Sequence, residues 1–227
     1  MAEPSPSPKG APSVLIVDDH ELVGTSLAVA LTAEGLRARR AAAVDLVGVL
    51  KEAASLPPGL ALLDLDLGRD RQGRRRDGVD LVVPLIEQGW SCLVLSAAER
   101  SRIGAALDAG AVAAVPKRAP WPVLLANVKA ALLGRPVMSP ETRQELIDSF
   151  RAHEAERREV AEKLNRLTQR EREVLSELAR GNRAQAVAEQ YVVSLATVRT
   201  QIRSVLSKLE VGSQLEAVAL YRRGHAG

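Results

Sequence analysis

Four short apolar runs constrain the fold of this 227-residue chain more than any other feature, because each leads into polar residues with chemical potential. Run 14–17 precedes Asp18 and Asp19, run 60–63 precedes Asp64, run 92–95 precedes Ser96, and run 111–115 precedes Pro116 and Lys117. In an open α/β sheet, parallel strands end at one common edge, where these folds bind their ligands. If the runs are strands, three carboxylates, a hydroxyl and an ammonium meet at that edge.

Segments with helical periodicity separate these runs. Apolar residues recur at helical spacing over 21–33, 44–54, 79–88, 99–109 and 122–133, and glycines end several of the segments. Segment 36–40 is a poorer strand, typical of a sheet edge. Five strand–helix units predict right-handed crossovers and a doubly wound, five-stranded parallel sheet with helices on both faces.

The polar residues at the predicted edge favour phosphoryl chemistry. Neighbouring carboxylates repel one another unless a hard cation lies among them, and Mg²⁺ takes oxygen ligands from one or two carboxylates together with phosphate. A carboxylate can attack phosphorus once a cation screens both charges. The pattern therefore predicts a Mg²⁺-assisted aspartyl-phosphate site.

Composition sets looser bounds. The apolar content of 46% is ordinary for a soluble protein, and no run reaches the length needed to cross a bilayer. Residues 1–12 are rich in Pro and Ser, so we expect a disordered tail rather than a signal peptide. The single cysteine, Cys92, lies in an apolar run and is expected to be a buried thiol. These features predict a cytoplasmic protein.

The middle of the chain, residues 139–165, is predicted to be a linker helix. Ser139, Pro140 and Glu141 supply an N-cap, a first-turn proline and a first-turn acid. Apolar residues then recur at alternating spacings of four and three, with His153 and Arg157 interrupting the stripe. A weak coiled coil and packing on the chain's own domains are both compatible with this pattern.

The final segment, 166–227, is predicted to be an all-α domain with ten basic and six acidic residues, a net charge of +4. Thr168 to Glu171 has the capping-box pattern. A helix running from Ser194 to about Leu209 has an apolar stripe, and its opposite face carries Thr197, Arg199, Thr200 and Arg203. Arginines one turn apart beside small hydroxyl residues suit the major groove of DNA.

The residues at the predicted sheet edge resemble those of a known family. Residues 13–138 are similar to the receiver domain of two-component response regulators, whose strands lie in the order 2-1-3-4-5. The resemblance implies that Asp64 accepts a phosphoryl group from a sensor histidine kinase. It also implies that Asp18, Asp19, Asp64 and the backbone carbonyl of Asp66 hold Mg²⁺, and that Ser96 and Lys117 contact the phosphoryl group.

The sequence departs from that family at three places. Gly68 and Gln72 stand where the family usually has Pro and Gly, and the expected Asp-Gly pair comes late, as Asp77-Gly78. About six extra residues, among them Arg69, Arg71 and Arg74-Arg75-Arg76, are thus predicted to form a solvated loop. The alternative is that these arginines reach the phosphate or a kinase. Ala114 stands three residues before Lys117, where the family usually has a large aromatic switch residue. Asp66 replaces a residue that is more often neutral.

Residues 166–227 resemble the LuxR-type helix-turn-helix domain. The resemblance rests on the run Leu167-Thr168-Gln169-Arg170-Glu171-Arg172-Glu173-Val174-Leu175 and on Thr197-Val198-Arg199-Thr200. It implies that Arg199, Thr200 and Arg203 lie on the recognition helix. Three departures are Ala184-Gln185-Ala186 for the usual Asn-Lys-Glu, Gln201 for histidine, and Glu210 for glycine.

Together these features predict a DNA-binding response regulator that is not an enzyme and acts as a homodimer on double-stranded DNA. Two other functions stay open on the sequence alone. One is a regulator that does not depend on phosphorylation and uses the receiver as a dimerisation or ligand platform, which Ala114 favours. The other is a haloacid-dehalogenase-type phosphatase, whose Asp-x-Asp motif resembles Asp64-Leu65-Asp66.

Overall fold

The structure is a computed structural model that describes residues 12–70 and 72–225. The predicted tail at 1–12 lies outside these residues, apart from Pro12. The chain divides into two compact units; the first ends at Phe150 and the second begins at Arg151. No helix among the described residues is long and apolar enough to span a membrane.

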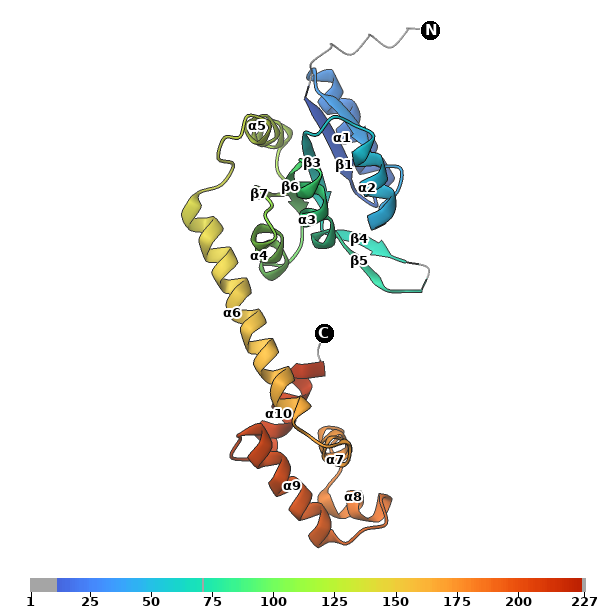
Figure 1. Ribbon diagram of the computed structural model, residues 1–227, viewed down its shortest axis with the longest axis vertical. Helices are drawn as coiled ribbons and strands as arrows, with labels where there is room; N and C mark the ends of the chain where they lie inside the picture. The colour runs from blue at the N-terminus through green and yellow to red at the C-terminus, as the bar shows by residue number, and fades with distance from the viewer. Residues whose placement is uncertain (1–11, 71, 226–227) are drawn as a thin grey trace. The chain divides into compact units, whose positions relative to one another are not determined.

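A five-stranded parallel sheet forms the centre of the first unit (Figure 1). Its strands are β1 (Ser13–Val17), β2 (Arg37–Arg40), β3 (Leu60–Asp64), β6 (Ser91–Ser96) and β7 (Ala113–Pro116). They lie in the order β2-β1-β3-β6-β7, which confirms the predicted order 2-1-3-4-5. The register pairs Asp64 with Leu95 and Ser96 with Pro116, so the carboxyl ends of the central strands lie at one edge.

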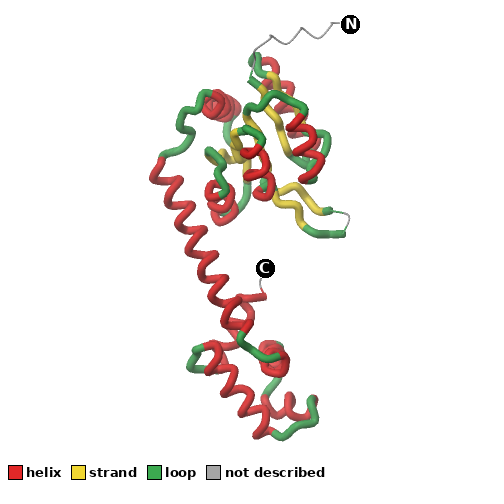
Figure 2. Tube along the Cα trace, viewed as in Figure 1, coloured by secondary structure: helices red, strands yellow, loops and turns green. Residues whose placement is uncertain are grey.

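Helices cover both faces of this sheet (Figure 2). They are α1 (Glu21–Ala33), α2 (Leu46–Ala54), α3 (Val79–Glu87), α4 (Arg100–Asp108) and α5 (Trp121–Leu132). Successive strand residues point to opposite faces. Residues such as Ile16 and Leu62 therefore pack against α1 and α5, while Leu15 and Leu63 pack against α2, α3 and α4. Because both faces of the central strands are buried, β1, β3 and β6 read as nearly continuous apolar runs, whereas the edge strand β2 does not. Cys92 is buried on one face, as predicted.

The insertion after Asp64 is a correction to the sequence-based prediction. Instead of a loop, it forms an antiparallel hairpin of β4 (Asp66–Arg69) and β5 (Arg75–Asp77). The Asp70 carboxylate closes the turn by accepting hydrogen bonds from the backbone amides of Gln72 (2.8 Å) and Arg74 (2.9 Å). Neither strand alternates apolar and polar residues, so the usual signal of a strand is missing.

Gly78 brings the end of this hairpin back against the acceptor strand. A Cβ at this position would lie 2.0 Å from the carbonyl oxygen of Asp64 and 3.0 Å from the Cα of Leu65. The backbone amide of Gly78 donates to the carbonyl oxygen of Leu65 at 3.0 Å. Glycine is therefore required here by the close approach of two backbone segments.

The linker helix α6 (Pro140–Asn165) begins as predicted, with the Ser139 hydroxyl accepting from the amide of Thr142 at 3.1 Å. Its apolar stripe packs on the chain's own units. Leu146 packs near Leu107 in the first unit, and Val160 and Leu164 join the core of the second. His153 and Arg157 are exposed. Of the two interpretations of the stripe, the structure shows packing on the chain's own domains.

The second unit is all-helical. It contains α7 (Gln169–Ala179), α8 (Ala184–Gln190), α9 (Leu195–Leu209) and α10 (Gln214–His225). The last of these had no counterpart in the sequence-based prediction, which followed the helices only to about residue 209. Leu175, Val205, Leu209 and Leu220 form the centre of the core.

Glu171 joins two of these helices. The predicted capping box is present, since Thr168 and Glu171 exchange hydrogen bonds at the start of α7. The buried carboxylate of Glu171 also accepts from Lys208 Nζ and Ser204 Oγ of α9, both at 2.6 Å. Burial alone would raise the pKa of Glu171, but these hydrogen bonds outweigh it and lower the pKa to about 2.

We expect Gly78→Ala to destabilise the first unit by about 1–3 kcal/mol, because the added methyl group must push the hairpin away from β3. The measurement is urea denaturation of the full chain. Gly212→Ala is the control, since the only atoms near its added Cβ are the carboxylate oxygens of Glu216, at 3.9 Å. An equal effect of both substitutions would contradict the packing argument.

We expect Glu171→Gln to destabilise the second unit by about 2–3 kcal/mol at pH 7. The folded pKa is depressed, so the stabilisation is present above the unfolded value of 4.5 and is lost as pH falls towards about 2. The deficit of the variant should therefore shrink across that window in denaturation curves measured at several pH values. The exposed Glu189→Gln is the control. A deficit that is independent of pH would show that the carboxylate charge plays no part.

Candidate functional site

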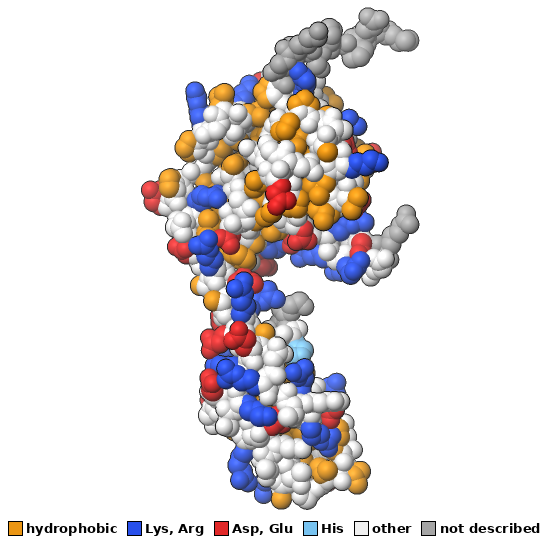
Figure 3. Space-filling model, in the orientation of Figure 1, with side chains coloured by type: hydrophobic (Ala, Val, Ile, Leu, Met, Phe, Trp, Pro, Cys, Tyr) orange, Lys and Arg blue, Asp and Glu red, His pale blue; other side chains and the backbone are white. Residues whose placement is uncertain are grey.

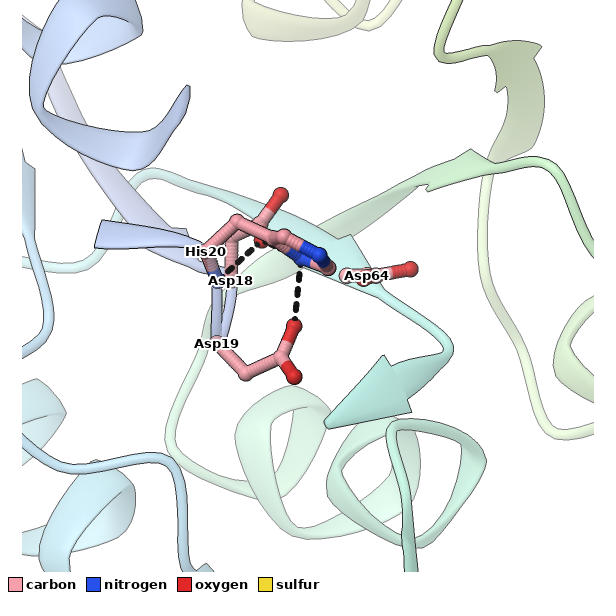
Figure 4. Close-up of side chains that lie close together, drawn as sticks. All are labelled: Asp18, Asp19, His20 and Asp64. Carbon is pink, nitrogen blue, oxygen red and sulfur yellow. Dashed lines mark hydrogen bonds and ion pairs between the residues drawn. The ribbon is translucent and has the colours of Figure 1, made fainter. Parts of the chain in front are cut away.

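The predicted acidic residues meet at the carboxyl edge of the sheet. Asp18 and Asp19 follow β1, and Asp64 is the last residue of β3. Together with His20 they offer ligand atoms that all lie within 4.8 Å of one another (Figure 4). The parallel pairing of β1 with β3 produces this juxtaposition, because it aligns Val17 with Leu63.

Lys117 follows the edge strand β7, and its side chain reaches this cluster. Its Nζ donates to Asp64 Oδ2 at 2.6 Å and to Asp18 Oδ2 at 2.8 Å. The side chains of Asp18 and Asp64 are 4% and 5% exposed, so neither carboxylate is fully solvated. One ammonium therefore neutralises part of the charge of two buried carboxylates.

Burial and charge act in opposite directions at this site. Burial is the largest influence on Asp64 and raises its pKa, although the hydrogen bonds from Lys117 and from the Asp66 amide lower it. Burial would lower the pKa of Lys117, but the hydrogen bonds to Asp18 and Asp64 raise it above the usual value. Asp64 thus has an incompletely compensated charge, whereas Lys117 is a firmly held cation.

Ser96 and Asp66 occupy the rim of the site. Ser96 is buried at the end of β6, and its Oγ accepts from the Ala98 amide at 2.7 Å. The Asp66 amide donates to Asp64 Oδ1 at 3.1 Å, while the Asp66 carboxylate lies outside the cluster and contacts Arg75. Asp64, Asp66, Ser96 and Lys117 all line one pocket of about 420 Å³.

Three further polar residues of this pocket were missed by sequence reasoning: His20, Glu99 and Arg102. Arg75 also lines the pocket, and it belongs to the arginine-rich insertion that the sequence had placed within possible reach of the phosphate. His20 Nδ1 lies 2.8 Å from Asp19 Oδ1 and 3.3 Å from Asp18 Oδ1. Its place directly after the acidic doublet is a signal that sequence reasoning could have used. Glu99 and Arg102 gave no such signal, because they lie at the start of α4, outside any motif that the sequence offered.

The donor set fits a hard divalent cation. Asp18, Asp19 and Asp64 supply carboxylate oxygens, which Mg²⁺ prefers, and the buried position of two of them favours a counter-ion. The imidazole of His20 suits softer metals better. An acidic cluster able to hold a cation is therefore present, as the sequence predicted.

Ala114 removes one familiar element from the site. It is half-buried and packs against the core on the side of α2, α3 and α4. A methyl group cannot swing between inward and outward positions as a large aromatic ring can. Any conformational response to a change at Asp64 must use other contacts.

The second candidate site is the exposed face of α9. Val198, Val205 and Leu209 of this helix are buried, whereas Thr197, Arg199, Thr200 and Arg203 are exposed, as the predicted stripe requires. Ser194 caps the helix by accepting from the Thr197 amide at 3.0 Å. The apolar stripe thus fixes which face of α9 is presented to a partner.

The arginines on this face have no acceptor within the described part of the protein. Of the described arginines and lysines from residue 166 onward, Arg183, Arg199 and Arg203 make no hydrogen bond or ion pair, whereas the others do. Arg180, for example, pairs with Glu177 at 2.6 Å. Arg183, which precedes α8, was not among the predicted DNA-binding residues. Free guanidinium groups are available to an anionic partner.

Glu210 is one of the departures from the LuxR-type pattern, and it stands at the end of the recognition-helix candidate α9. It ends α9 in the left-handed conformation, with φ of 58° and ψ of 43°, which glycine adopts without strain. Its carboxylate pairs with Arg166 at 2.8 Å and with Lys163 at 3.4 Å. These ion pairs give Glu210 side-chain contacts that a glycine would lack.

Two family models match the chain. "Response regulator receiver domain" matches residues 14–129, and "Bacterial regulatory proteins, luxR family" matches residues 165–221. The first match includes the whole acidic pocket and the second includes α9. The phosphatase alternative gains no support from these matches.

Curated relatives match along nearly their whole length. The response regulator protein VraR of Staphylococcus aureus is 30% identical over 90% of this chain and 93% of its own. The transcriptional regulatory protein LiaR of Bacillus subtilis is 26% identical over 93% of this chain and 97% of its own. A structure of the RcsB response regulator of Salmonella typhimurium is 21% identical, with a TM-score of 0.47 over 93% of this chain and 98% of that one. From the family match and the relatives, the chain belongs to the transcriptional response regulators that combine a receiver domain with a LuxR-type helix-turn-helix domain.

Proposed function

We propose that phosphorylation of Asp64 by a sensor histidine kinase controls the binding of this protein to double-stranded DNA. The observation that carries the proposal is the shared ammonium of Lys117, held by Asp64 and Asp18 at the ends of β3 and β1. A cation between two buried carboxylates is able to stabilise the additional negative charge of a phosphoryl group. The predicted cytoplasmic location and the domain limits 13–138, 139–165 and 166–227 belong to this proposal.

Each residue of the pocket has a distinct role in this proposal. Asp64 is the nucleophile, and its raised pKa reflects a carboxylate that is poorly solvated and therefore reactive. Asp18, Asp19, Asp64 and the backbone carbonyl of Asp66 would hold Mg²⁺. When bound, this ion screens the charge of the incoming phosphate and polarises its oxygens.

Lys117 and Ser96 would contact the transferred group. Lys117 already lies 2.6 Å from Asp64 and can shift from the carboxylate to a phosphoryl oxygen as a point charge. Ser96 Oγ can donate to such an oxygen while it continues to accept from the Ala98 amide. Both groups stabilise the additional negative charge of the product.

DNA recognition is assigned to Thr197, Arg199, Thr200 and Arg203 on the exposed face of α9. The arginines supply charge for phosphates or guanine edges, and the small hydroxyl residues permit close approach. We infer a homodimer, because helix-turn-helix proteins usually read two half-sites. Phosphorylation would shift the population between two receiver conformations and so bias dimerisation.

A regulator that does not depend on phosphorylation is the second candidate, and Ala114 is the observation that favours it. DNA affinity measured with and without beryllofluoride, at fixed salt, separates the two functions. The phosphorylation-dependent function requires a difference between the two affinities.

We expect Asp64→Asn to abolish labelling by acetyl phosphate in the presence of Mg²⁺, because an amide cannot form the acyl phosphate. Labelling is measured by a mobility shift in a phosphate-affinity gel. The exposed Asp80→Asn is the control and should be labelled like the unaltered protein. Persistent labelling of the Asp64→Asn variant would reject Asp64 as the acceptor.

We expect Arg199→Ala and Arg203→Ala each to weaken binding to a random-sequence 30-base-pair duplex and to lower the salt dependence by about one phosphate contact. Binding is measured by fluorescence anisotropy over a range of salt concentrations. Arg180→Ala is the matched control, because its guanidinium already pairs with Glu177. An equal loss in all three variants would point to general charge rather than to this face of α9.

A further inference from the structure

The inserted hairpin places its second strand beside the acceptor. β4 begins two residues after Asp64, and β5 ends at Asp77, directly before the tightly packed Gly78. The register pairs Asp66 with Asp77 at the base of the hairpin. The basic side chains that lie along it are all arginines (Figure 3). The hairpin is therefore a basic element anchored at the rim of the pocket.

Two arginines neutralise the two carboxylates at this base, and they are held to different degrees. Arg102 of α4 lies 2.8 Å from Asp77, also donates to the carbonyl oxygen of Leu65, and is only 18% exposed. Arg75 lies 3.2 Å from Asp66, and the two side chains are 50% and 59% exposed. Arg102 is thus fixed in the structure, whereas the pair of Arg75 and Asp66 is solvated and readily exchanged.

Arg75 also shares a pocket with the acceptor. It lines the same pocket of about 420 Å³ as Asp64, Ser96 and Lys117. Its partner Asp66 is joined to Asp64 Oδ1 through the backbone amide at 3.1 Å. The pocket therefore contains a guanidinium whose only partner among the described residues is an exposed carboxylate.

We propose that Arg75 is a phosphoryl-binding residue, which leaves Asp66 and binds the phosphoryl oxygens when Asp64 is phosphorylated. This inference rests on the proposed function of Asp64. A phosphoryl group carries up to two negative charges against the single charge of Asp66, and its oxygens match the planar fork of a guanidinium. The displaced carboxylate of Asp66 turns to water, where its charge is solvated.

The role of Arg75 in the transfer is to bind, not to react. A carboxylate oxygen of Asp64 forms the new bond to phosphorus. The bond between phosphorus and the donor's nitrogen or oxygen breaks, and its electron pair stays on the donor. Arg75 contacts the non-bridging oxygens throughout and exchanges no proton, because its guanidinium stays protonated.

The test uses the full-length chain with Mg²⁺ and beryllofluoride, which imitates the bound phosphoryl group. We expect Arg75→Gln to weaken beryllofluoride binding about tenfold, the loss of one charge-assisted hydrogen bond. Binding is measured by titration calorimetry. Arg75→Lys should recover part of the affinity, because it restores the charge without the fork.

Arg76→Gln is the matched control, because it removes the same charge from the adjacent position of β5, whose side chain points to the opposite face. Asp66→Asn tests the exchange with Arg75 intact, and should tighten binding several-fold because the guanidinium no longer leaves a charged partner. Equal affinities for the Arg75→Gln and Arg76→Gln variants would overturn the role of Arg75.

The role of Asp64 and the role of Arg75 are tested separately. If the unaltered protein neither binds beryllofluoride nor accepts a phosphoryl group, the proposed function of Asp64 fails. If it does both, and Arg75→Gln does both equally well, only the inference about Arg75 fails.

Discussion

The site depends on one ammonium held between two buried carboxylates. Parallel pairing forces Asp18 and Asp64 to the same edge of the sheet, where burial removes most of their hydration. Lys117 reaches both from β7 and offsets their repulsion, so the central strands can end side by side. The remaining negative charge is what a divalent cation would balance. The topology of the sheet therefore determines the charge of the site, because it brings the carboxylates together.

The hairpin and α4 extend this arrangement outward. Gly78 lets the hairpin return against the backbone of Asp64, and Arg102 joins the base of the hairpin to α4. Gly104, on the same helix, lets α4 approach α6, since a Cβ there would lie 2.5 Å from the carbonyl oxygen of Leu146. These contacts form a continuous path of packed groups within the first unit. They join the hairpin, α4 and the beginning of α6 around the pocket without any contribution from a large side chain at Ala114.

The sequence predicted the parts of the fold that buried residues determine. The strands ending in Asp64 and Ser96 were evident because both faces of the sheet are covered, which makes them continuously apolar. The hairpin was missed because apolar and polar residues do not alternate around Arg75. Helix α10 was missed because no sequence motif indicated it. The contacts of Arg102 with Asp77 and Leu65 join residues that are far apart in the sequence, so no local pattern predicts them. They exist only once α4 and the hairpin have folded together.

The same distinction between paired and unpaired charge identifies the partner face of the second unit. Net charge alone is weak evidence for nucleic-acid binding, because most arginines here serve the fold: Arg166 holds Glu210 and Arg222 donates to the carbonyl oxygen of Ala179. A guanidinium without an acceptor adds nothing to the fold through ion pairs. In the described part of this unit from residue 166 onward, such groups are confined to α9 and to the residue before α8. The buried stripe of α9 places its unpaired arginines on one exposed face. Their charge is therefore available to the phosphates of DNA.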